Sequence, residues 1–178
     1  PDGTKKTVAQ FQMGYKGFKQ LALRTGQFKT IHAADVREGE IKHYDRLTGS
    51  IDFQWIQDET ERLKAKVVGY VSYFSLLNGY EQTFYMPIEK VREHAKKYSK
   101  TFTHQSGLWT TSFDEMALKT VTKLNLSRNA PLSVEMQNAI VADQSEVKNA
   151  ETIDVTYVDN DEPATIELET LIMLYDMK

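Results

Sequence analysis

The fold depends on residues 11–27, FQMGYKGFKQLALRTGQ. This stretch has the spacing of an amphipathic helix. At about 100° per residue, one face of this helix is mostly apolar and is expected to be buried: Tyr15, Phe18, Leu21, Ala22 and Thr25. The opposite face is a ladder of cationic and amide groups: Lys16, Gln20 and Arg24. At about 1.5 Å per residue the ladder is about 12 Å long, enough to contact two neighbouring phosphates. It is therefore either a phosphate-binding surface or an ordinary solvated helix face.

The residues around this helix define its ends. Residues 7–13, TVAQFQM, alternate between apolar and polar and predict a strand with Gln12 on its amide-rich face. Gly26 is typical of the position just after a helix C-terminus. Residues 14–17, GYKG, match the G-x-x-G loop with which KH domains hold a nucleic-acid backbone. That loop has a helix on each side, so we interpret the present match as a backbone turn.

From residue 28 onward the apolar period changes to two, which is typical of strands. Five segments have this pattern: residues 28–36, 40–45, 50–56, 64–77 and 80–86. Turn-forming residues separate them, and Asn78-Gly79 is a strong signal for a type I′ hairpin. The sequence therefore predicts an α+β fold in which an antiparallel sheet of about five strands, with hairpins, is packed by flanking helices.

Helical spacing returns after Pro87, a residue that suits the first position of a helix. The pattern predicts helices over residues 88–98, over about 112–126, and over a shorter stretch capped by Ser133. The second of these helices carries Lys119 and Lys123 at i, i+4 spacing on the flank of its apolar face. Arg128 follows near its end and adds a further positive charge.

Charge is divided unevenly along the 178 residues, although the net value is only −3. Residues 1–130 hold 20 Lys and Arg against 14 Asp and Glu, whereas residues 131–178 hold 2 against 11. A basic body with an acidic extension is typical of polyanion binders that carry a regulatory or partner-binding segment. We expect a core over residues 1–143 and an acidic flexible tail over residues 144–178, ending in an apolar segment, LIMLYDMK, that could dock on a partner.

The composition points to an ordinary folded domain in a reducing compartment. The chain has no cysteine, which excludes disulfides and thiolate metal sites. No apolar run approaches the roughly 18 residues of a membrane span, and no signal-peptide pattern opens the chain. We therefore expect a cytoplasmic protein without a membrane partner.

Signals for catalysis are weak, because the chain has none of the common nucleotide-binding, zinc-protease or serine-hydrolase motifs. The four histidines show no ligand spacing: His32, His43, His94 and His104. Acidic residues in the body could in principle bind Mg²⁺ as in a nuclease, but ion pairing is the better interpretation: Asp35, Asp52, Asp114 and Glu115. Trp109, just before the second helix, is either a packing anchor or a platform on which a base stacks.

Three blocks together resemble the RecT family of phage and prophage single-strand annealing proteins. They are FQMGYKGFKQLALRTGQFKTIHAADVREGE at residues 11–40, WTTSFDEMALKTVTKL at 109–124, and SRNAPLSVEMQNAIVAD at 127–143. The resemblance covers about three quarters of the chain in the right order. It implies a RecT-like or Red-beta-like annealing fold, and also that the core is N-terminally truncated, because family members usually have a further helical region before the first block.

The resemblance implies a non-enzymatic function: binding and annealing of single-stranded DNA without ATP, cofactor or metal, in phage-type homologous recombination. The implied partners are single-stranded DNA, the annealed duplex intermediate, further copies in a ring or helical filament, a RecE-type exonuclease and the host single-strand-binding protein. The DNA is expected to be held by its backbone in a basic groove. The residues assigned to that groove are Gln12, Tyr15, Lys16, Gln20, Arg24, Trp109, Lys119, Lys123 and Arg128. Two alternatives stay open, a Mg²⁺-dependent nuclease and a protein-interaction module of a recombination complex.

Overall fold

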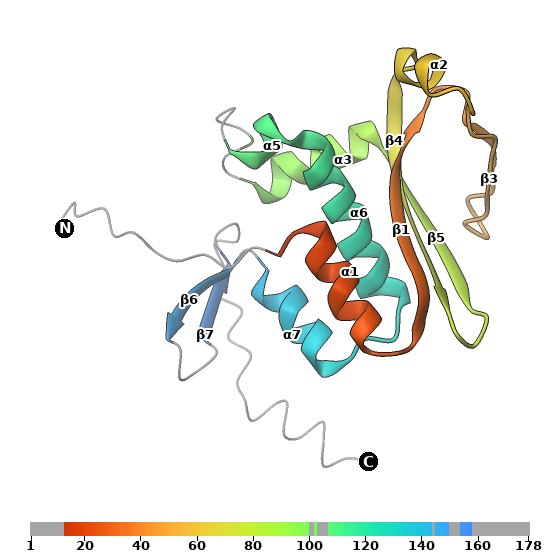
Figure 1. Ribbon diagram of the computed structural model, residues 1–178. Coiled ribbons are helices and arrows are strands. Elements are labelled where there is room, and N and C mark those ends of the chain that lie inside the picture. The colour runs from red at the N-terminus through yellow and green to blue at the C-terminus, as the bar shows by residue number, and fades with distance from the viewer. Residues whose placement is uncertain (1–12, 100–101, 103–106, 144, 150–153, 158–178) are drawn as a thin grey trace. The chain divides into compact units, whose positions relative to one another are not determined.

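The central strand of the main sheet is β4 (Val67–Leu76), which pairs on both edges. Its neighbours are β1 (Phe28–Arg37) and β5 (Glu81–Pro87), and both pairings are antiparallel. The computed structural model describes residues 13–99, 102, 107–143, 145–149 and 154–157 (Figure 1). Two compact units are present, residues 13–140 in one and residues 1–12 with 141–178 in the other, and the sheet belongs to the first.

All five predicted strands form, but they divide between two sheets rather than forming one. β2 (Ile41–Tyr44) and β3 (Ile51–Phe53) pair only with each other and form a separate two-stranded sheet. With four and three residues, mostly exposed or half-buried, they offer no continuous apolar face to the ten-residue β1. We call residues 41–55, which comprise this hairpin and Trp55, the arm.

The helices of this unit cover one face of the three-stranded sheet, while the arm lies over the other face (Figure 1). α6 (Phe113–Asn129) packs on all three strands, α1 (Tyr15–Arg24) packs on α6 and β1, and α3 (Ile88–Tyr98) packs on β4 and β5. α5 (Leu108–Thr111) lies against α6. α7 (Val134–Ala142) follows α6 in the chain. The helices predicted over residues 15–25, 88–98, 112–126 and after Ser133 are thus confirmed. The Ser133 side chain accepts a hydrogen bond from the Met136 amide, 3.3 Å.

Apolar side chains of the sheet and of the helices that cover it form two core clusters. The first gathers Phe18, Ala22, Phe28, Ile31, Phe74, Leu76, Leu126 and Met136. The second gathers Ala33, Tyr70, Val91, Ala95, Trp109, Met116, Ala117 and Val121. A polar contact fixes α6 on the sheet between them, because the buried Asn125 amide donates to the Ser72 carbonyl, 3.1 Å. Leaving such a group unpaired would cost about 1–3 kcal/mol, so the contact also specifies register.

The β4–β5 connection falls at the predicted position but has a different geometry. Leu76 donates its amide to the Tyr80 carbonyl, 2.8 Å, and Gly79 donates to the Leu76 carbonyl, 3.1 Å. Residues 77–79 therefore form a three-residue loop, in which Gly79 has φ +89°. A two-residue type I′ turn is ruled out because Leu77 joins Asn78 and Gly79 in the loop.

A buried carboxylate ties the base of the arm together. Glu40, fully buried, accepts from Arg62 Nε at 2.8 Å and from the Arg37 amide at 2.7 Å. Arg62, in α2 (Glu59–Lys64), also contacts Asp35 at 3.2 Å. We call Glu40, Arg62, Arg37 and Asp35 the latch. It explains why the chain returns to the sheet after an excursion of two short strands.

The second unit contains an antiparallel hairpin of β6 (Ser145–Asn149) and β7 (Asp154–Tyr157). These strands lie in the predicted flexible tail, where the sequence showed no sustained period. The strand predicted over residues 7–13 falls, except for Met13, outside the described residues, as do residues 171–178.

Gly69 of β4 lies where the sheet has no room for a larger side chain. A Cβ at this position would lie 2.5 Å from Tyr85 Cε2 and 2.7 Å from the Met86 carbonyl oxygen. We predict that Gly69→Ala lowers the free energy of unfolding by about 1–3 kcal/mol, measured by urea denaturation. Gly14→Ala is the control, because nothing lies within 4 Å of the added methyl, and it should cost less than about 1 kcal/mol. Equal losses in the two variants would contradict this packing.

Candidate nucleic-acid interface

The ladder on α1 has the orientation that the sequence predicts. Lys16, Gln20 and Arg24 are exposed, while Phe18 and Ala22 on the opposite face are fully buried. Neither Lys16 nor Arg24 forms an ion pair within the part of the chain that the structure describes. The two charges are thus available to an anion without breaking an internal bond.

Tyr15 positions this helix rather than extending its ladder. Its side chain is half-buried and packs against the second core cluster. Burial raises the pKa of its hydroxyl, and a hydrogen bond with the Ala33 backbone opposes that shift. Tyr15 therefore joins the start of α1 to β1 and fixes where Lys16 lies. Gln12, the other early residue assigned to the groove, lies outside the described residues.

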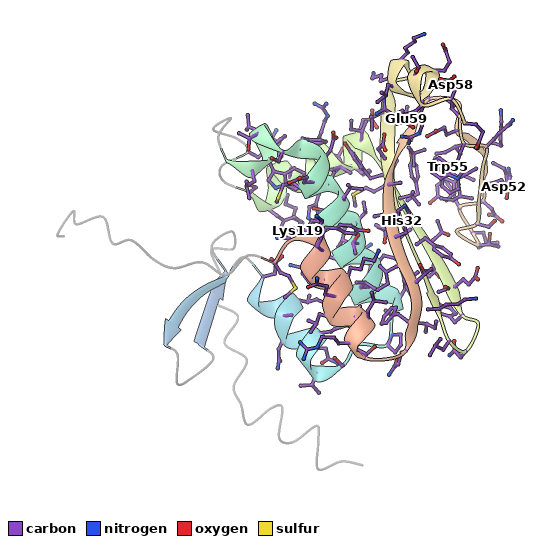
Figure 2. The ribbon with its side chains drawn as sticks, viewed as in Figure 1. His32, Asp52, Trp55, Asp58, Glu59 and Lys119 are labelled. Atoms are coloured by element: carbon purple, nitrogen blue, oxygen red, sulfur yellow. The ribbon has the colours of Figure 1, made fainter. Side chains whose placement is uncertain are left out.

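The three basic residues of α6 differ in their surroundings. Lys119 is only 6% exposed and lies among the helices (Figure 2). Lys123 is half-buried, and Arg128 is exposed, with its guanidinium 5.7 Å from the centre of the Phe84 ring. Almost all of the Lys119 side chain is covered, so Lys123 and Arg128 are the better placed to meet a phosphate.

Lys123 and Arg128 belong to a cluster that spans two helices. Burial lowers the pKa of His94, and the nearby charges of Lys123, Arg128 and Lys97 lower it further. His94 also lies 4.6 Å, ring centre to ring centre, from Tyr98. We call Lys97, Lys123, Arg128 and His94 the α3–α6 cluster. The sequence did not indicate it, because nothing in the spacing of α3 shows which of its faces meets α6.

Trp109, which the sequence left open as a packing anchor or a base-stacking platform, packs in the helical layer. It is 5% exposed and its ring lies 5.5 Å from Phe113 and 6.2 Å from Phe102, edge-on in both cases. Little of this ring is open to a base. In this structure Trp109 is a packing anchor that holds α5 against α6.

The acidic residues considered for a nuclease are engaged elsewhere or dispersed. Asp35 pairs with Arg37 and Arg62, as the ion-pairing interpretation expected. Asp114 accepts a hydrogen bond from the buried Tyr70 hydroxyl, and desolvation together with this carboxylate raises the pKa of that hydroxyl. Within the described ranges, no group of three or more acidic or histidine side chains has the geometry to hold a metal ion. Likewise, no helix in those ranges is both long and apolar enough to cross a bilayer.

The lowered pKa of His94 predicts a specific dependence of stability on pH. The unfolded chain binds a proton at this residue near pH 6.5, whereas the folded protein resists it, so stability falls as the pH drops below about 6.5. We expect His94→Gln to reduce this loss in thermal unfolding between pH 8 and pH 5. His43→Gln, at an exposed position, serves as the control for the loss of an imidazole. Identical pH profiles for wild type and His94→Gln would refute the assignment.

Comparison with known proteins identifies the family to which these helices belong. The family model described as "RecT family" matches residues 1–156. The "Uncharacterized protein YqaK" of Bacillus subtilis (strain 168) is 44% identical over 148 residues, which are 83% of this chain and 48% of that protein. "Protein RecT" of Escherichia coli (strain K12) is 32% identical over 142 residues, 80% of this chain and 50% of that protein. The chain thus spans about half the length of these relatives. Since the family match includes α1, the whole sheet and α6, this chain belongs to the RecT family.

Proposed function

We propose that this chain is the part of a RecT-type protein that binds single-stranded DNA through its phosphates and promotes annealing of complementary strands. The observation that carries the proposal is the α1 ladder. Its two cations form no ion pair with the described residues, and they face solvent from a helix that is otherwise anchored in the core. Gln20 between them adds a neutral hydrogen-bonding group to the same track.

The α3–α6 cluster supports the same function from a second pair of helices. Lys97, Lys123 and Arg128 lie close enough to His94 to add to the lowering of its pKa by burial. Positive charges gathered on two neighbouring helices form a surface to which phosphates are attracted. Family membership favours DNA as the source of these phosphates.

Backbone contacts suit annealing, because a protein that must pair any two complementary sequences has to leave base edges free. Neutralising the phosphates of two strands also reduces the repulsion that slows their encounter. The reaction so described needs no ATP and no bond cleavage, and the protein acts as a DNA-binding factor rather than a classical enzyme.

The wider assignment follows from the family and remains part of the proposal. It comprises assembly into a ring or helical filament, location in the cytoplasm of a bacterial host, a phage or prophage origin, and cooperation with a RecE-type exonuclease and the host single-strand-binding protein.

The two alternative functions give different results in simple assays. A Mg²⁺-dependent nuclease would shorten end-labelled single-stranded DNA, whereas the proposed function leaves it intact and anneals it to a complementary strand without ATP. A module that acts only through its acidic C-terminal segment would lose its activity when residues 144–178 are removed. DNA binding by the core should survive that removal.

The salt dependence of DNA binding tests the role of the ladder. Each phosphate contact on a single strand contributes about 0.7 to the log–log slope of affinity against salt concentration. We predict that the double substitution Lys16→Gln and Arg24→Gln weakens binding of oligothymidylate and lowers the slope by about 1.4. The control is Lys64→Gln, because Lys64 is equally cationic but already pairs with Glu61 at 2.8 Å. An unchanged slope in the double variant would remove α1 from the interface.

A further inference from the structure

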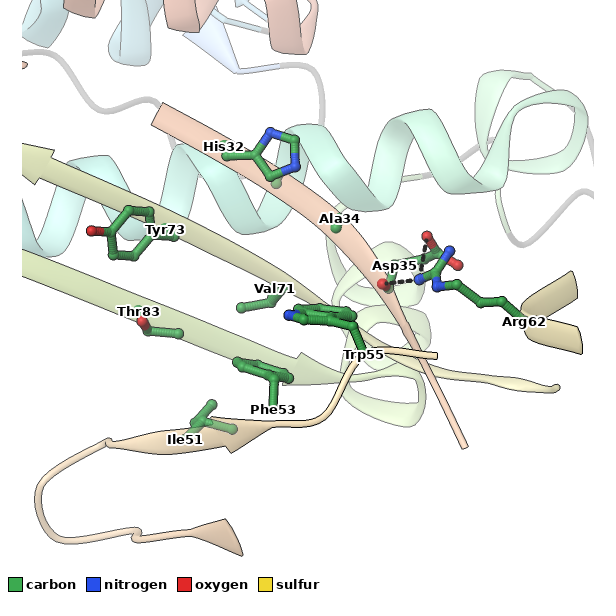
Figure 3. A pocket seen from close by; sticks show the side chains of 11 residues that line it. His32, Ala34, Asp35, Ile51, Phe53, Trp55, Arg62, Val71, Tyr73 and Thr83 are labelled. Carbon is green, nitrogen blue, oxygen red and sulfur yellow. Dashed lines mark hydrogen bonds and ion pairs between the residues drawn. The ribbon is translucent and has the colours of Figure 1, made fainter. Parts of the chain in front are cut away.

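The face of the sheet opposite the helices carries a cavity of about 490 Å³ beneath the arm. Ile51, Phe53 and Trp55 of the arm form one wall, and β1, β4 and β5 form the other (Figure 3). Its volume is within the range of about 300–1,000 Å³ that is usual for small-ligand pockets. The function proposed above uses only the helices, so this cavity has no role in it.

The arm presents a flat aromatic surface to the cavity. Phe53 and Trp55 are stacked, with ring centres 4.7 Å apart and an interplanar angle of 11°. The Trp55 side chain nevertheless stays 38% exposed. The indole thus has Phe53 stacked on it and the Arg62 guanidinium 6.0 Å from its centre, yet it stays partly exposed. A partly exposed tryptophan that lines a cavity is suited to pack against a further planar ring.

The latch holds Trp55 in this position. The amides of Gln54 and Ile56, the residues on either side of it, donate to the Glu40 carbonyl at 2.8 Å and to the Glu40 carboxylate at 3.4 Å. The guanidinium of Arg62 lies 6.0 Å from the centre of the indole ring. The fully buried charge of Glu40 therefore serves to pre-organise one exposed aromatic side chain.

The opposite wall, formed by the sheet, offers side chains that can form hydrogen bonds. His32, Tyr73 and Thr83 lie in one cross-strand row and supply an imidazole and two hydroxyl groups. The charged groups of the lining, Asp35 and Arg62, are paired with each other at 3.2 Å. Arg62, the one Lys or Arg of this lining, is already paired, whereas a planar heterocycle would find stacking and hydrogen-bonding partners.

We infer that the cavity binds the base of an unpaired nucleotide, stacked on Trp55. The inference rests on the proposed function, since that function supplies the unpaired DNA. It adds a second contact region, because the arm that lines the cavity and the helices that include α1 lie on opposite faces of the sheet (Figure 1). Phosphates bind along the helices, and a base from another part of the strand is held under the arm.

The test compares oligothymidylate with an oligonucleotide of equal length that is abasic throughout. Trp55 and Trp109 are the two tryptophans of the chain, and Trp109 is buried, so a stacked base should quench chiefly the emission of Trp55. We expect quenching by oligothymidylate and little by the abasic strand. We also expect Trp55→Ala to weaken oligothymidylate binding about tenfold, the loss of one base–aromatic stack, while abasic binding is unchanged. Trp55→Phe should retain most of the affinity.

Leu47→Ala is the matched control, because Leu47 lies on the same arm but is 93% exposed and does not line the cavity. If neither oligonucleotide binds, the proposed function fails. If both bind equally without quenching Trp55, the phosphate contacts stand and the base site is refuted. Should Trp55→Ala not fold, the wild-type quenching and the Trp55→Phe affinity still decide the question.

Discussion

The packing of α6 on β4 is the interaction on which the rest of this structure depends. β4 is paired on both edges, and its helix-facing side chains, among them Tyr70 and Phe74, are fully buried beneath the helices. The Asn125 amide then bonds the Ser72 carbonyl, which sets the rotation of α6 as well as its position. α1 packs on α6, and α3 shares the second core cluster with it, so the positions of the basic residues on these helices depend on how α6 lies on the sheet.

Much of this arrangement follows from the sequence, because helical and strand periodicity report which side chains are buried. The two faces of α1 and the five strands were predicted from spacing, and the start of the fourth helix from Ser133 as its cap. Periodicity does not report which neighbour covers a side chain. For this reason Trp109 and Lys119, assigned to the groove by their place in a family block, are found almost fully covered in the helical layer.

The arm shows a second limit of prediction from spacing. Residues 40–45 and 50–56 have the alternation of strands, and they do pair, but nothing local indicates that they leave the main sheet. The departure depends on Glu40 meeting Arg62, 22 residues later in the chain. A buried acid with a distant basic partner is seen only when the fold brings the two together, so the latch and the cavity beneath the arm were not predicted.

The resulting protein separates two kinds of chemistry on the two sides of one sheet. We propose that the cations on α1, α3 and α6 bind phosphates, and that the aromatic cavity, whose Asp35 and Arg62 are paired with each other, binds a planar ring. The central claim is that DNA phosphates bind the basic residues of the helices. Lysine acetylation followed by mass spectrometry, with and without oligothymidylate, tests this claim most directly. The account predicts that DNA protects Lys16 and Lys97 but leaves Lys64 and Lys90 reactive, since these last two already pair with Glu61 and Glu93. Uniform protection of all four lysines, or protection of none, would contradict it.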